Sequence, residues 1–321
     1  MSDDPGTPRK SHRVRWIISA LFYTALVVFL ALYLTTLDFE SLTSTRVNWW
    51  IFALALAVGI TNRYWMILIW IVLLNGLGAR TRGKTTALSV VYAKSWLGRY
   101  IPGTAPWILG KIHFASQLGI SKTRLAVSSL LEAGLQITVL LVSGLALIAL
   151  DPRASIVSNE LQWLMVGFTV VGVAMLLPPV FNRVFALAYR VIRRRTIDNA
   201  ALPGFRTIGS GTALHVVGAM LAGLSMFLVA RSLDPTLGAH DLLYLIAAMN
   251  LASAVSMIAV FAPSGIGVRE TILVLLLGAV MSAELALLTA VVLRVWSIIA
   301  DFAFLGVAAT VRGIARQAGR P

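Results

Sequence analysis

The chain has 321 residues, of which 58% are hydrophobic and only 12% charged, and its mean hydropathy is +0.85. A soluble domain carries about 25% charged residues, so this composition excludes a water-soluble globule. The net charge is +14, from 27 Lys and Arg against 13 Asp and Glu. In a membrane protein this excess is typical of basic loops kept in the cytoplasm, and we expect no nucleic-acid partner. The sequence has no cysteine, which excludes disulfides, thiol nucleophiles and cysteine-bound metals.

Long apolar runs predict an all-α, polytopic membrane protein. Polar, basic tails at 1–15 and 313–321 flank these runs. The predicted spans are 16–37, 49–74, 125–150, 161–180, 207–230, 242–262 and 285–310. Two further stretches, 86–120 and 263–282, are apolar on average, but Pro and Gly interrupt them and they contain charges.

The loops between these runs differ in charge, which predicts the side of the membrane on which each lies. The basic segments are 79–85, 181–206 and the C-terminal tail. The nearly neutral loops are 38–48, 151–160 and 231–241. Because cytoplasmic loops retain Lys and Arg, we expect both termini on the cytoplasmic side of the cell membrane.

One basic segment is also amphipathic. Between Phe181 and Ile192 apolar residues recur at helical spacing beside Arg183, Arg190 and Arg194. This pattern is typical of a helix that lies along the inner membrane surface. It fits either a positively charged anchor or a lipid-binding surface, and the pattern alone leaves both open.

The two interrupted stretches have proline and serine residues at equivalent positions, which indicates an internal repeat. Pro102 and Pro263 are 161 residues apart, as are Ser121 and Ser282, and each serine stands where an N-cap would begin the next long helix. Each half, 16–150 and 151–312, then contains two spans, a broken hairpin and one long helix. Since five elements are an odd number, the second half would be inverted relative to the first, with re-entrant hairpins as in many transporters.

Nine ionisable residues fall at membrane depth. Six are positive and three negative: Arg63, Lys94, Arg99, Lys111, Arg269 and Arg294, and Glu132, Glu270 and Asp301. An unpaired charge at the bilayer centre costs at least roughly 2.5–3.5 kcal/mol, so these groups should face the interior and pair. We expect structural ion pairs at Glu132, Arg294 and Asp301, with Arg294 opposite one of the two carboxylates.

The hairpins are the predicted substrate site. Their Pro and Gly residues would expose backbone amides at the start of each second arm, and a helix N-terminus binds anions. The predicted binding residues are Arg99, Pro102, Gly103, Lys111, Pro263, Gly265, Gly267, Arg269 and Glu270. Close helix packing by small residues is the alternative explanation for the glycines. The four histidines are too scattered for a metal site, and we expect no cofactor.

Pro263-Ser-Gly-Ile-Gly-Val-Arg-Glu270 resembles the P-G-G-x-G-x-R-E signature of the lysylphosphatidylglycerol synthase transmembrane family, the flippase-like integral membrane proteins. Arg99-x-x-Pro102-Gly103 and Gly110-Lys111 are similar to the first hairpin of that family. Ser264 stands where Gly is usual, and Pro106-Trp107 is an addition. The resemblance covers about 15–312 and implies a lipid translocation domain. Its bifunctional members add a soluble aminoacyltransferase, which is not expected in a chain that stops at Pro321.

The leading hypothesis is a flippase-like transporter, not an enzyme, that moves an anionic phospholipid or a polyprenyl-phosphate-linked sugar. Two alternatives remain open: a membrane-embedded transferase acting on such a lipid, and a non-transporting partner of a lipid-modifying enzyme. The transferase would need an acid/base pair among Glu132, Glu270 and Asp301. A homo-oligomer is compatible with all three.

Overall fold

The computed structural model describes residues 46–100, 105–153, 158–193, 202–259 and 267–318. Within these ranges every regular element is helical, which confirms the all-α class. The predicted span 16–37 and the predicted site residues Pro102, Gly103, Pro263 and Gly265 lie outside the described residues.

Among the described residues, five helices are long and apolar enough to cross a membrane. They are α3 (Trp49–Gly76), α6 (Lys122–Ala149), α9 (Phe205–Leu233), α10 (Leu242–Ile258, preceded by the 3-10 turn η4, Ala239–Asp241) and α12 (Ala283–Ala318). These helices confirm five of the predicted spans. Ser121 and Ser282 directly precede α6 and α12, as predicted for residues at N-caps.

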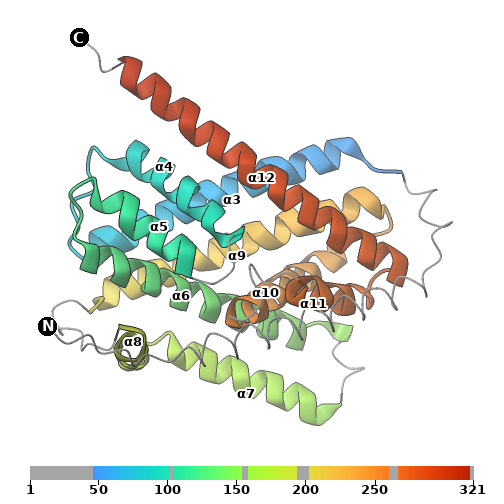
Figure 1. Ribbon diagram of the computed structural model, residues 1–321. Coiled ribbons are helices and arrows are strands. Elements are labelled where there is room, and N and C mark those ends of the chain that lie inside the picture. Colours follow the sequence, from blue (N-terminus) through green and yellow to red (C-terminus); the bar gives the residue numbers. More distant parts are fainter. Residues whose placement is uncertain (1–45, 101–104, 154–157, 194–201, 260–266, 319–321) are drawn as a thin grey trace, which may run out of the picture.

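The predicted span 161–180 ends about five residues earlier than expected, and the amphipathic segment predicted to follow it forms a separate helix. The helix α7 (Asn159–Met175) ends early, and α8 (Pro178–Arg193) continues at an angle of 86° to it. Two prolines, Pro178 and Pro179, cause this break, because the residue before a proline is driven out of the helical region and a proline has no N–H to donate. Helix α7 packs on α6 and leaves most of its apolar side chains exposed (Figure 1).

Two broken hairpins enter the bundle from opposite ends (Figure 1). The first consists of α4 (Thr85–Trp96), the 3-10 turn η1 (Leu97–Tyr100) and α5 (Ala105–Ser116), and the second of α10 and α11 (Val268–Leu277). Lys84 Nζ donates to Leu118 O at 2.7 Å, so the first hairpin is closed at its base. At the other end of the bundle, Tyr244 Oη donates to Leu276 O at 2.9 Å.

Three of the four arms of these hairpins are short, whereas α10 is long enough to cross. Helices α4, α5 and α11 have 12, 12 and 10 residues, which gives lengths of about 18, 18 and 15 Å at 1.5 Å per residue. A helix needs about 20 residues to cross the hydrocarbon core. Each of these arms therefore ends inside the thickness of the bundle instead of crossing it.

The centre of the bundle is an antiparallel pair, α3 and α9. The N–H of Asn48, before α3, donates to Ser232 O near the end of α9 at 2.8 Å, and Gly76 at the end of α3 faces Thr207 at the start of α9. Glycines allow close approach here and where α9 meets α10. A methyl group on Gly223 would lie 2.7 Å from Ile246 Cα, a backbone atom of α10.

Gly223→Ala is expected to destabilise the protein by about 1–3 kcal/mol, because the added methyl group forces two backbones apart. The matched control is Gly209→Ala on the same helix, where a methyl group would meet no atom within 4 Å and alanine favours the helix. Unfolding in detergent, followed by circular dichroism, measures both. Equal stability of the two variants would contradict the close packing of α9 on α10.

Candidate functional site

The ends of both hairpins lie against the middle of α12. Trp96, the last residue of α4, donates its indole N–H to Asp301 Oδ1 at 3.1 Å. Near the start of α11, Glu270 Oε1 lies 3.7 Å from Arg294 Nη1. Arg294 and Asp301 are seven residues apart, or about 10 Å along the helix. Hairpins that begin at opposite ends of the bundle thus converge within two turns of one helix.

Asp301 is buried in an ion pair with Arg63 of α3. Arg63 Nε lies 2.6 Å from Asp301 Oδ1, whose side chain has no exposed area. The remaining guanidinium nitrogens donate to Gly59 O and Ser297 O at 3.0 and 3.1 Å. Asp301 is thus bonded to Arg63 and Trp96, two partners that its position in the sequence did not suggest. This cluster fastens α3, α4 and α12 to one another.

A second buried ion pair joins Lys111 of α5 to Glu132 of α6. The Nζ–Oε2 distance is 2.6 Å, and Tyr92 Oη donates to the other carboxylate oxygen at 2.7 Å. Three rings surround the ammonium group: Nζ lies 4.0, 4.5 and 5.2 Å from the ring centroids of Tyr92, Trp107 and Trp70. Aromatic faces stabilise a cation in this geometry.

This pair changes how two predicted residues are understood. Lys111, predicted to bind substrate, has no exposed area and already has a carboxylate partner. Glu132, which the sequence allowed to face Arg294, is bonded instead to Lys111 and Tyr92. In this structure the Lys111 ammonium group is enclosed by protein side chains, one of which is Trp107 of the Pro-Trp addition in the first hairpin.

The backbone at the start of α11 is already hydrogen-bonded to an anionic side chain of the chain itself. Gly267 has a φ of +86°, a conformation that suits glycine because it has no side chain. Its N–H donates to Glu270 Oε2 at 2.8 Å, so the backbone amide predicted to bind a substrate anion is bonded to the chain's own carboxylate. Arg269 Nη2 lies 3.6 Å from Met249 Sδ of α10. Gly267, Arg269 and Glu270 are thus gathered where α10, α11 and α12 meet.

Lys94 is a cation that the predicted site omitted. It lies in the last turn of α4, two residues before Trp96, and its side chain is exposed although its neighbours on both sides are buried. Within the described part of the chain no carboxylate lies within ion-pair distance of it. The sequence signal was its position next to the Pro-Gly break. Arg99 lies in η1, and its side chain is outside the described residues.

Among the described residues at membrane depth, positive side chains outnumber negative ones. Arg63 and Lys111 each have one buried carboxylate partner, and Arg294 is paired with Glu270 at the longer distance. Five positive side chains therefore face three negative ones, an excess of two even without Arg99. The hairpin ends provide a cationic environment.

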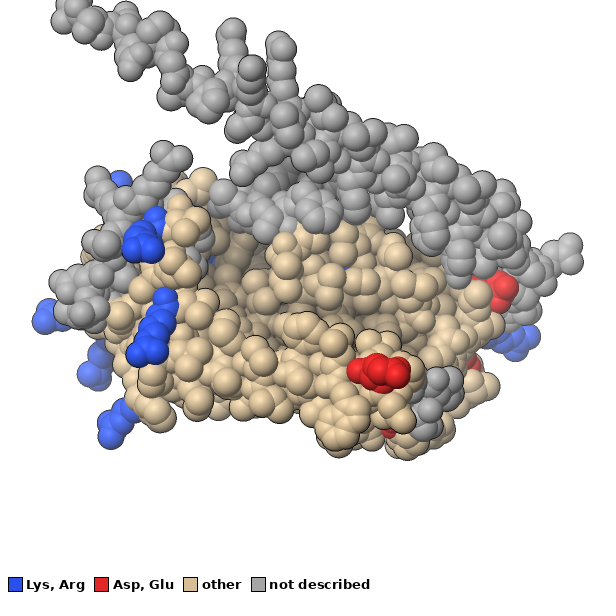
Figure 2. Space-filling model, turned by 90° about the horizontal axis from the view of Figure 1, so that it is seen from below, with Lys and Arg blue, Asp and Glu red and all other residues tan. Residues whose placement is uncertain are grey.

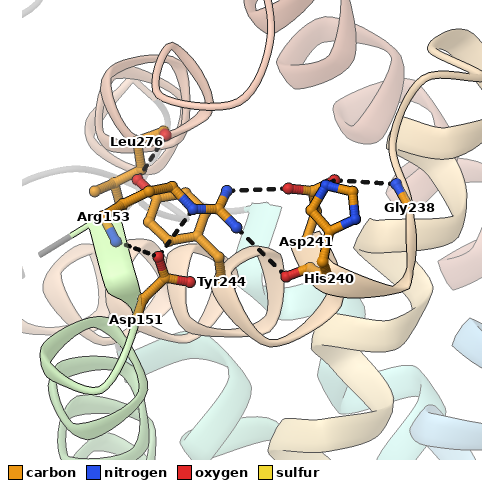
Figure 3. A network of polar contacts seen from close by, with 7 residues as sticks. All are labelled: Asp151, Arg153, Gly238, His240, Asp241, Tyr244 and Leu276. Carbon is orange, nitrogen blue, oxygen red and sulfur yellow. Dashed lines mark hydrogen bonds and ion pairs between the residues drawn. The ribbon is translucent and has the colours of Figure 1, made fainter.

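A separate polar network joins the turn after α6 to η4 and the start of α10 (Figure 3). Arg153, in the segment after α6, donates to Asp151 Oδ1 at 2.8 Å and to Asp241 Oδ1 at 3.0 Å. Its guanidinium lies 4.6 Å from the ring centroid of Tyr244. His240 Nε2 lies 3.0 Å from Asp241 Oδ2. The network ties the end of α6 to the start of α10.

A cavity of about 570 Å³ adjoins this network, between the turn at 152–153, the loop 236–241 and the turn at 279–280. None of the predicted site residues lines it. Within the described ranges, no group of three or more His, Cys, Asp or Glu is placed to hold a metal ion.

Surface charge divides the molecule along its length. On the face shown in Figure 2, most blue side chains gather at one end, few charged side chains lie in the middle, and red acidic groups lie toward the other end, where a further blue side chain is also visible. The exposed basic residues at the first end are Arg80, Arg82, Lys122, Arg124, Arg183, Arg190 and Arg206. All of these except Lys122 and Arg124, which lie in the first turn of α6, belong to the basic segments 79–85 and 181–206 that the sequence predicted to be cytoplasmic.

Comparison with known protein families identifies a match. The sequence model of a family described as "Lysylphosphatidylglycerol synthase TM region" matches residues 16–304. No curated protein matches the chain.

Proposed function

Because the chain belongs to the lysylphosphatidylglycerol synthase transmembrane family, we propose that it translocates an anionic lipid across the cytoplasmic membrane. The proposed cargo is a phospholipid or a polyprenyl-phosphate-linked sugar, and the proposed role is transport and not chemistry. The observation that carries this proposal is the convergence of the two broken hairpins, from opposite ends, on the middle of α12.

The packing of the helices supports two inverted halves. Helix α4 packs on α12 as α10 packs on α6, and α5 packs on α6 as α11 packs on α12. The antiparallel helices α3 and α9 would occupy equivalent positions about the centre. In inverted-repeat transporters, broken helices meet near the midplane, and rocking of one half against the other exposes that site to each side in turn.

The charges suggest how a headgroup would be accommodated. A lipid headgroup must cross about 30 Å of hydrocarbon, and its phosphate needs compensating charge on the way. In the proposed mechanism Arg269, Lys94 and Arg99 supply that charge. Glu270 holds the Gly267 amide in the state described, and an incoming phosphate would take its place there.

The carboxylates favour transport over the transferase alternative. Glu132, Asp301 and Glu270 are each bonded to a cationic partner. A general base must be able to accept a proton from a substrate within hydrogen-bond reach, and a carboxylate neutralised by a buried cation is poorly suited to this role.

The proposal is tested by reconstitution into liposomes that contain a fluorescent lipid, with a reductant added outside to bleach the outer leaflet. We expect protein-dependent loss of the inner-leaflet signal. Separate preparations with labelled phosphatidylglycerol and with a labelled polyprenyl-phosphate sugar distinguish the two cargoes. Rates equal to those of empty liposomes for both lipids would contradict transport and favour the non-transporting partner.

The orientation can be tested independently by cysteine labelling, since the chain has no native cysteine. His240 has a side chain that is 77% exposed, and Arg82 is exposed at the basic end. In intact cells a membrane-impermeant maleimide is expected to label His240→Cys, and Arg82→Cys only after permeabilisation. The reverse pattern would invert the proposed topology, and labelling of both from outside would contradict placement on opposite sides.

A further inference from the structure

Helix α8 is held to the protein by one of its three faces. Phe181, Phe185 and Tyr189 recur every four residues and are buried. The first two rings stack at 6.0 Å with an interplanar angle of 16°, and Phe181 packs against Gly134 of α6. Asn182 adds a hydrogen bond to Pro203 O at 3.1 Å. These contacts attach one face of the helix to the bundle.

Among the described residues, the other two faces of α8 carry exposed side chains. Arg183 and Arg190, seven residues apart, form an exposed basic stripe. Val184, Leu187 and Val191 form an exposed apolar stripe, with 41%, 52% and 70% of their surface accessible. At 3.6 residues per turn the two stripes lie side by side. A neighbouring environment that is anionic on one side and apolar on the other would match both.

The direction of α8 indicates what that environment is. Its axis is bent by 86° from α7, whose long apolar side chains, among them Trp163 and Phe168, are exposed. If α7 runs through the bilayer, α8 lies in the membrane plane at the end where the basic side chains gather. Leu177, at the bend, is also exposed and continues the apolar surface from α7 to α8.

We propose that α8 is a binding surface for anionic phospholipids of the leaflet at the basic end, with Arg183 and Arg190 on the headgroups and Val184, Leu187 and Val191 among the acyl chains. The continuity with the apolar surface of α7 favours a lipid over an acidic soluble protein, which would leave the apolar stripe in water. The surface lies apart from the hairpins, and the proposal does not require that the bound lipid be transported.

The first test measures depth with single cysteines in an otherwise cysteine-free chain. A fluorescent label at Leu187→Cys is expected to be quenched by lipids carrying a nitroxide near the headgroup end of the acyl chain. A label at Arg183→Cys is expected to be quenched mainly by aqueous iodide. Equal iodide quenching at both positions would overturn the interfacial placement.

The second test measures lipid selectivity. With the label at position 187, quenching by brominated phosphatidylglycerol is compared with quenching by brominated phosphatidylcholine at equal content and low salt. The preference for the anionic lipid is expected to fall about fivefold for each arginine removed, equivalent to about 1 kcal/mol per basic residue near the membrane surface. Arg183→Gln/Arg190→Gln should therefore show almost no preference.

The matched control is Arg80→Gln/Arg82→Gln, which removes two exposed charges in the loop between α3 and α4 and none from α8. This variant should keep the preference. An equal fall in both double variants would show a general effect of net charge and overturn a surface specific to α8, as would no fall in either. Neither readout depends on transport, so a failure here is distinct from a failure of the proposed function.

Discussion

Replacing Lys111 by methionine is expected to lower the free energy of unfolding by about 3–5 kcal/mol, the usual cost of removing one partner from a buried ion pair. Methionine preserves the length and most of the volume of the side chain, so the effect isolates the charge. Glu132 would remain with Tyr92 as its bonded neighbour and with its negative charge unmatched. Unfolding of the purified protein in detergent, followed by circular dichroism, gives the measurement.

Two further variants make this expectation specific. Lys94→Met removes an exposed cation from the same hairpin and should change stability by less than about 0.5 kcal/mol, as is usual for surface substitutions. Lys111→Met/Glu132→Gln removes both charges and should recover part of the loss, which a double-mutant cycle quantifies. If Lys111→Met lowered the free energy of unfolding as little as Lys94→Met, the buried ion pair would not contribute to the stability of the fold.

Arg269→Gln is expected to reduce lipid exchange about 10- to 100-fold while the protein remains folded. A hydrogen bond to a charged group contributes about 1.5–3 kcal/mol, and in the proposed mechanism Arg269 makes such bonds to the lipid phosphate at the hairpin end. Arg269→Lys keeps the charge but loses the planar fork of donors, so its rate should be intermediate. The liposome assay measures all three proteins.

The control for transport is Arg206→Gln, since Arg206 is exposed in the first turn of α9, away from the hairpin ends. Its exchange rate should equal that of the parent. If Arg269→Gln fails to accumulate in the membrane, the residue is structural and the site assignment is wrong. If it accumulates and transports at the parent rate, Arg269 lies outside the lipid path.

The long helices were predictable because a run of about 20 apolar residues has few alternatives in a membrane. Helices α3, α6, α9, α10 and α12 follow this rule closely. The run at 161–180 did not, because hydropathy does not register the two prolines that end α7 and turn the chain into α8. Proline chemistry could have located that bend.

The ion-pair partners could not be predicted from spacing along the chain. Arg63 and Asp301 are 238 residues apart, and only the packing of α3 against α12 brings them together. The Arg153 network was missed for a different reason. Loops 151–160 and 231–241 looked nearly neutral by net charge, yet Asp151, Arg153 and Asp241 lie in them and neutralise one another. A net charge near zero can therefore conceal charged residues that form ion pairs with one another.

The length of α12 has a mechanical consequence. Its 36 residues extend over about 54 Å, about 24 Å more than the hydrocarbon core, and its C-terminal part projects beyond the neighbouring helices (Figure 1). From Asp301 to Ala318 the lever arm is about 25 Å. A tilt of about 10° about Asp301 would therefore displace the C-terminal end of the helix by about 4 Å. Movements of the hairpins that tilt α12, which they touch near its middle, would therefore be largest at its C-terminal end.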